Sequence, residues 1–103
     1  MTVETEHAIY HNCWIQVDHY LADSSLAIWI KNNNHGAIAK ITTCLDRLLI
    51  KQNEAFVDVN NCPWAEDFIK KYHLGKPTGQ TKHSGFCTYP LYRFDMNEVK
   101  KYT

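Results

Sequence analysis

The chain has 103 residues, 45% of them apolar and 13% aromatic, which suits one folded domain and argues against disorder. Eleven basic and eleven acidic side chains cancel, so no overall field attracts nucleic acid and any such contact has to be local. No apolar run approaches the roughly 20 residues of a membrane-spanning helix. Residues 1–6 are acidic and do not resemble a signal peptide. We expect a single domain over residues 1–103 in the cytoplasm, without membrane contact and with reduced thiols.

Three segments in the first half alternate between apolar and polar residues, which is typical of strands. They cover residues 8–20, 26–31 and 37–43, and turn-forming residues separate them at 23–25 and 32–36. Such spacing predicts an antiparallel meander. Trp14 and Trp29 alternate with the aliphatic residues of their strands, so we expect one or both to lie outside the core. Residues 44–53 are ambiguous between a loop and one helical turn, and residues 55–59 predict a short fourth strand.

Residues 63–74 predict the principal helix. Pro63 suits the first helical position, Asn61 or Cys62 would be the cap, and Gly75 would be the first residue beyond the end. Pro77 prevents the helix from continuing. Glu66 and Asp67 place acidic residues near the predicted start, and Lys70 and Lys71 place basic residues near the predicted end. An apolar stripe is formed by Trp64, Phe68 and Tyr72.

A basic loop over residues 76–85 and an aromatic strand over residues 86–95 are expected next. Pro90 cannot donate to a ladder, so this strand should lie at an edge or carry a bulge there. Residues 96–103 predict a helical turn or a frayed tail. The fold class is therefore α+β: a mainly antiparallel sheet of about five strands, with the helix over residues 63–74 packed on one face.

Cysteine and histidine spacing gives little support to catalysis or metal binding. The four cysteines form no C-x-x-C pair, and His7 and His11 fall in a strand-like segment without an H-E-x-x-H motif. Cys62 precedes the helix, where a thiol pKa is lowered, but His73 would lie about 15 Å away. We expect no enzyme, no cofactor, no metal and no small-molecule substrate, and keep a zinc-binding or thiol enzyme as an alternative.

The basic and aromatic side chains after the helix are the candidate binding residues: Lys76, Lys82, His83, Tyr89 and Arg93. Basic groups next to aromatic rings suit either RNA or single-stranded DNA, which combine phosphate with stacking bases. Tyrosine, tryptophan and arginine are also the usual anchors of protein interfaces. The pattern therefore predicts a contact surface but leaves its partner open.

Residues 54–68, 74–79 and 84–95 together resemble a family of small uncharacterised proteins encoded on conjugative and other mobile elements of Firmicutes. The resemblance covers nearly the whole chain and is most specific from Asn60 onward. It implies an anti-defence role: a non-enzymatic anti-CRISPR inhibitor of type II systems, acting on the effector protein Cas9, its guide RNA or their expression. The alternative is a nucleic-acid-binding accessory protein of a conjugative element. Neither reading defines the oligomeric state.

Overall fold

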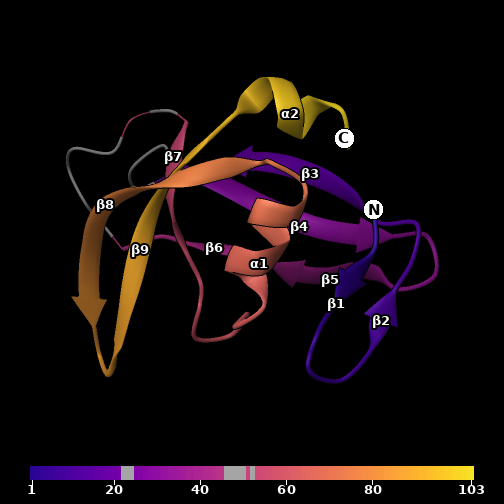
Figure 1. Ribbon diagram of the computed structural model, residues 1–103, viewed down its shortest axis with the longest axis horizontal. Helices are drawn as coiled ribbons and strands as arrows, with labels where there is room; N and C mark the ends of the chain where they lie inside the picture. The colour runs from indigo at the N-terminus through magenta and orange to yellow at the C-terminus, as the bar shows by residue number, and fades with distance from the viewer. Residues whose placement is uncertain (22–24, 46–50, 52) are drawn as a thin grey trace.

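The computed structural model describes residues 1–21, 25–45, 51 and 53–103. Strands and helices alternate only in the second half of the chain (Figure 1). The described elements are β1 (Val3–Glu4), β2 (Ile9–Tyr10), β3 (Trp14–His19), β4 (Leu26–Asn32), β5 (Gly36–Lys40), β6 (Thr42–Thr43), β7 (Glu54–Val57), α1 (Ala65–Lys71), β8 (Gly75–Ser84), β9 (Cys87–Phe94) and α2 (Met96–Lys100).

The strands form three antiparallel sheets, with orders β1-β2, β3-β4-β5 and β6-β7-β9-β8. The predicted α+β class and antiparallel pairing are confirmed, and so is the meander β3-β4-β5. The expectation of one sheet with about five strands is wrong. The chain divides its strands among several small sheets instead.

Two local interruptions of the predicted strands explain this division. The predicted strand over residues 8–20 breaks at Asn12, whose φ is +56°, so β2 turns back to pair with β1 and only β3 joins the meander. The predicted strand over residues 37–43 divides at Ile41. The Ile41 N–H donates to Ile28 O, and the Asp58 N–H donates to Ile41 O, so this residue links the two larger sheets.

The principal helix is shorter than predicted. α1 starts after Trp64, which caps it without a side-chain hydrogen bond, so Asn61 and Cys62 are not the cap. At the other end, the residue beyond the C-cap is His73, with φ +56°. The N–H groups of Leu74 and His73 donate back to Ile69 O and Lys70 O, which is the Schellman pattern. A histidine therefore takes the conformation expected of Gly75.

Gly75 has a different structural role, because it is the first residue of β8. A Cβ built at Gly75 would lie 2.6 Å from the carbonyl oxygen of Arg93, so only glycine allows β8 to approach β9 this closely. The predicted loop over residues 76–85 is consequently wrong: residues 76–84 belong to the long strand β8, paired with β9, and Gly85 begins the turn between the two strands.

Both features predicted for Pro90, a sheet edge and a bulge, occur next to this residue. β7 pairs with β9 only from Arg93 to Leu91, so at Pro90 one side of β9 has no described strand beside it. The register of β8 also shifts between Pro77 and Thr81, opposite this point. The bulge is thus in β8, the partner strand. α2 confirms the predicted C-terminal helical turn, and Asp95 caps it by accepting from the N–H groups of Asn97 and Glu98.

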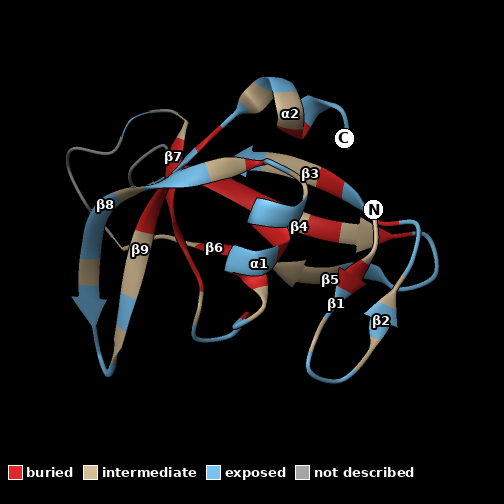
Figure 2. Cartoon of the chain, viewed as in Figure 1, coloured by how far each residue is buried: buried red, intermediate tan, exposed pale blue. Residues whose placement is uncertain are grey.

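The core lies between the inner face of β3-β4-β5, the helix α1 and one face of β7 and β9 (Figure 2). Its largest fully buried members include Ile15, Ile28, Ile30, Ile69 and Phe94. The predicted stripe on α1 is confirmed: the rings of Trp64 and Phe68 are 5.9 Å apart and those of Phe68 and Tyr72 are 5.2 Å apart. The predicted turn at 23–25 and the ambiguous segment 44–53 lie partly outside the described residues.

Candidate functional site: the distal β8-β9 hairpin

The outer half of the β8-β9 hairpin extends beyond the rest of its sheet. Pairs from Thr81↔Pro90 to Ser84↔Cys87 continue the β8-β9 ladder, whereas β7 pairs with β9 only as far as Leu91. Residues 81–90, here called the distal hairpin, therefore form a two-stranded ribbon that projects from the body (Figure 1). Its residues are exposed or half-buried (Figure 2).

The tip of the distal hairpin is a two-residue turn made by Gly85 and Phe86. Gly85 has φ +62° and open space where a Cβ would lie, as the first position of a type II′ turn requires. This turn holds Phe86 away from the molecule, so the residue is fully exposed. Burying such a ring against a partner removes apolar surface from water and therefore stabilises the complex.

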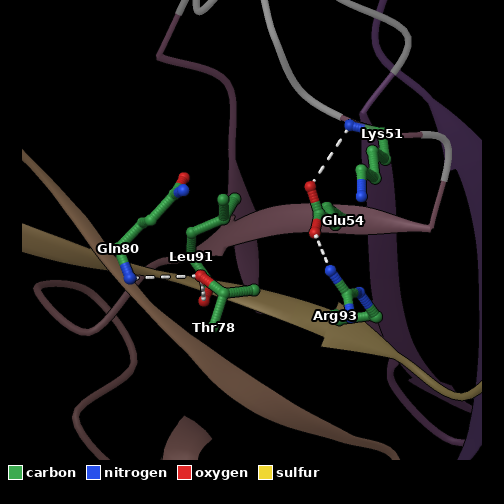
Figure 3. Close-up of polar contacts among 6 residues, drawn as sticks. All are labelled: Lys51, Glu54, Thr78, Gln80, Leu91 and Arg93. Atoms are coloured by element: carbon green, nitrogen blue, oxygen red, sulfur yellow. Dashed lines mark hydrogen bonds and ion pairs between the residues drawn. The ribbon is translucent and has the colours of Figure 1, made fainter.

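Side-chain and backbone contacts fix the base from which this hairpin projects (Figure 3). At the register shift, the Thr78 hydroxyl donates to Leu91 O at 3.0 Å and accepts from the Gln80 N–H at 3.1 Å. Gly79, with φ +89°, makes the bend between them. Thr78 thus provides hydrogen-bond partners for two backbone groups at the point where the strand ladder is interrupted.

The five predicted binding residues do not form one patch. The register places Lys76 opposite Arg93 and Lys82 opposite Tyr89, on the same face of the sheet. His83 lies opposite Thr88 on the other face, and its Nδ1 is 3.1 Å from the Thr88 hydroxyl. Lys82, Tyr89 and His83 belong to the distal hairpin, whereas Lys76 and Arg93 lie at its base.

Two of these residues have structural contacts. The Arg93 guanidinium donates to Glu54 Oε2 at 3.1 Å, and the other oxygen of this buried carboxylate accepts from the Lys51 N–H (Figure 3). The Lys82 ammonium donates to Leu45 O at 2.9 Å. Tyr92, which is next to Arg93 on β9, is buried and donates to Glu66 Oε1 at 2.7 Å. Burial and this carboxylate raise the Tyr92 pKa.

Sequence reasoning therefore gave Phe86 too little weight. The signal was the dipeptide Gly85-Phe86 between two alternating segments, which is typical of a two-residue hairpin turn. The predicted loop over residues 76–85 concealed this turn signal. The long strand β8 is what converts a scattered basic segment into a projecting ribbon with an aromatic tip.

A groove lies at the base of the hairpin, between α1, the start of β8 and the start of α2. Charges of both signs line this open groove, among them Glu66, Lys70, Lys76 and Glu98. Alternating signs give no preference for an anionic or a cationic ligand. We therefore assign the distal hairpin, and not the groove, as the candidate site.

The cysteine environments and the arrangement of possible metal ligands give little support to a catalytic thiol or a metal site. Cys13 and Cys62 are buried, and Cys44 and Cys87 are half-buried. Burial, with the nearby carboxylates of Asp58 and Glu6, raises the pKa of Cys62 to about 11, opposite to the lowering expected before a helix. Within the described ranges, no three His, Cys, Asp or Glu side chains cluster as metal ligands. No described helix is long and apolar enough to cross a bilayer.

A family model matches most of the chain. A family model described as a domain of unknown function, DUF4313, matches residues 14–103. No curated protein and no solved structure matches the chain significantly. Because the model covers most of the sequence, the chain belongs to the DUF4313 family.

Proposed function

We propose that this member of the DUF4313 family is a non-enzymatic binding protein that contacts its partner with the distal hairpin. The observation that supports this most directly is the fully exposed Phe86 at the tip of a ribbon that extends beyond its sheet. Large aromatic rings in such positions are frequent anchors of protein interfaces. Lys82 and His83 supply basic groups to the same ribbon.

The hairpin has a local charge that the whole chain lacks. From Gly75 to Phe94 the hairpin has three lysine or arginine residues, Lys76, Lys82 and Arg93, and no acidic residue. A partner surface that complements it is therefore acidic. Such a surface occurs on proteins as patches of carboxylates and on nucleic acids as the phosphate backbone.

The partner we propose is the type II CRISPR effector Cas9, which makes the chain an anti-defence protein of a mobile genetic element. The resemblance of residues 54–68, 74–79 and 84–95 to small proteins of conjugative elements supports this choice. The exposed apolar ring favours a protein surface over a nucleic-acid duplex, because the duplex has its bases already stacked and its phosphate backbone offers nothing apolar to contact.

Affinity purification of the full chain from a host with a type II CRISPR system tests the proposal. We expect Cas9 to co-purify with the parent chain and its DNA cleavage to fall in a reconstituted reaction. Phe86→Ala should lose most of both effects. Leu21→Ala is the matched control, since it removes another fully exposed apolar side chain outside the hairpin, and it should behave like the parent. Normal Cas9 activity and levels, without recovery of effector or guide RNA, would refute the target.

The acid-free basic segment supports a second candidate, a nucleic-acid-binding accessory protein of a conjugative element. Salt separates the two candidates. Affinity for nucleic acid should fall steeply with ionic strength, in proportion to the number of neutralised phosphates. A partly apolar protein interface should weaken less, so a shallow salt dependence favours the effector protein as the partner.

A further inference from the structure

The outer face of the β3-β4-β5 sheet has a composition that core packing does not explain. Its strand register places Trp14 opposite Lys31, Gln16 opposite Trp29, and Trp29 opposite Lys40. All of these side chains point away from the inner row that holds Ile15 and Ile30. Two tryptophans and two lysines therefore share one face, and Trp14 is 37% exposed.

Each lysine lies next to an aromatic ring on this face. The Lys31 ammonium is 5.9 Å from the centre of the Trp14 ring. The Lys40 ammonium is 5.3 Å from the Trp29 ring and 5.0 Å from the Tyr20 ring. Such contacts at partly exposed sites are weak enough to be exchanged for a stronger anionic partner.

Hydrogen bonds hold part of this arrangement in place before any ligand arrives. The Lys31 ammonium donates to Gln16 Oε1, and Gln16 Nε2 donates to Asp18 Oδ2 at 3.0 Å. The Tyr20 hydroxyl donates to Thr42 O at 3.0 Å, which fixes its ring at the other end of the face. A preformed site loses less conformational entropy when a ligand binds.

The register also sets the spacing of the tryptophans. Trp14 and Trp29 are diagonal neighbours on adjacent strands, which places their Cα atoms about 7–8 Å apart. Two flat rings at this separation, each with a cation beside it, suit two bases and two phosphates of one strand. At the outward-facing paired positions of these strands the aliphatic side chains are Ala27 and Ala37, so flat rings and cations, which suit bases and phosphates, are the main contact groups of this face.

We propose that the outer face of β3-β4-β5, here called the aromatic sheet face, binds single-stranded nucleic acid. Bases stack on Trp14 and Trp29, and Lys31 and Lys40 contact phosphates. Duplexes are poor ligands, because their bases are already stacked and paired. The site is independent of the proposed function, which rests on the distal hairpin.

Fluorescence anisotropy with the full chain tests this site. The probes are labelled 12-nucleotide oligo(U) and oligo(dT), with a duplex of equal length for comparison. We expect saturable binding of at least one single strand and weaker binding of the duplex. The RNA and DNA arms identify which strand the face prefers. Lack of saturable binding to either single strand at 50 mM salt would overturn the inference.

Two variants locate the binding. Trp14→Ala should weaken it at least about fivefold, the lower end of what one base–aromatic stack contributes. With two lysines on phosphates, the parent should show a slope of log K against log salt near −1.4, and Lys31→Gln should bring it to about −0.7. Lys31→Gln keeps both tryptophans, so it remains informative if Trp14→Ala folds poorly. A parent-like affinity of Trp14→Ala with native circular dichroism, or an unchanged slope of Lys31→Gln, would contradict the site.

Phe86→Ala is the control that separates this site from the distal hairpin. Phe86 lies in the turn between β8 and β9, two strands of a different sheet, so removal of its ring should leave oligonucleotide affinity unchanged. If Phe86→Ala weakens binding while Trp14→Ala does not, nucleic acid binds the hairpin and the inference is wrong. If both sites are real, Phe86→Ala loses only the protein partner and Trp14→Ala only the oligonucleotide.

Discussion

Cys62 precedes α1, yet its environment opposes ionisation. The thiol is 5% exposed and donates to Lys40 O at 3.6 Å. Burial comes first among the causes that raise its pKa, and the carboxylates of Asp58 and Glu6 add to it. The N-terminus of so short a helix does not compensate for these effects. A residue that looks reactive from its position in the sequence is thus held neutral by its surroundings.

This environment predicts a pH dependence of stability. The Cys62 pKa rises from 9.0 to about 11 on folding, so the unfolded chain releases the thiol proton first as pH increases. The stabilising contribution is complete below pH 9 and is lost between pH 9 and 11. Urea unfolding should show a smaller loss over this interval in Cys62→Ala than in the parent. Equal losses in both proteins would contradict the raised pKa.

At the scale of elements, the β8-β9 hairpin combines a structural base with an exposed end. Arg93 pairs with the buried Glu54 of β7, and it lies directly opposite Lys76. Two like charges facing each other across strands are unfavourable, so the Glu54 carboxylate helps to hold the hairpin base together. Arg93 should therefore influence partner binding through the position of the hairpin more than through contact.

We expect Arg93→Ala to lower the free energy of unfolding by about 1–3 kcal/mol, because it leaves the Glu54 carboxylate buried without its cation. Urea unfolding measures the change. The double variant Glu54→Gln with Arg93→Ala should regain part of the loss, since no charge is then buried. Lys76→Ala, which alters the facing exposed lysine, is the control and should change stability little. A loss as large in Lys76→Ala would show that the ion pair is not the cause.

At the scale of the whole molecule, the two ends of the described chain meet on α1. The Tyr72 hydroxyl accepts from the Thr2 N–H at 2.8 Å and donates to Thr2 O at 3.1 Å. The rings of Tyr72 and Tyr102 are 5.4 Å apart. The Ile15 N–H also donates to Tyr102 O, which ties the C-terminal segment to β3. Residues from the two ends thereby close the same side of the core.

Tyr102→Ala should lower the free energy of unfolding by about 1–3 kcal/mol, because it removes a half-buried ring and its contact with Tyr72. Thermal unfolding checks this. Lys101→Ala is the neighbouring control: it removes an exposed ion pair with Glu98, and exposed ion pairs contribute little to stability. Equal effects of the two substitutions would argue that the Tyr102 ring has no packing role.

The sequence by itself determined the features that depend on neighbours along the chain. Period-two alternation located β4 and the meander, and the residues around Gly36 marked its tight turn. The charges and aromatic stripe of α1 identified the helix. These signals are local, because side-chain spacing and turn conformation depend on a few adjacent residues.

Only the tertiary structure decided how strands were shared among sheets and which side chains meet. Ile41 separates β5 from β6 through hydrogen bonds to Ile28 and Asp58, which are distant in sequence. Residues 76–85 carry the glycine and proline content of a loop, yet pairing with β9 makes residues 76–84 a strand. The same pairing exposes Phe86 and places His83 apart from Lys82. Long-range backbone pairing overrode local preference, which is why the site differs more from expectation than the fold class does.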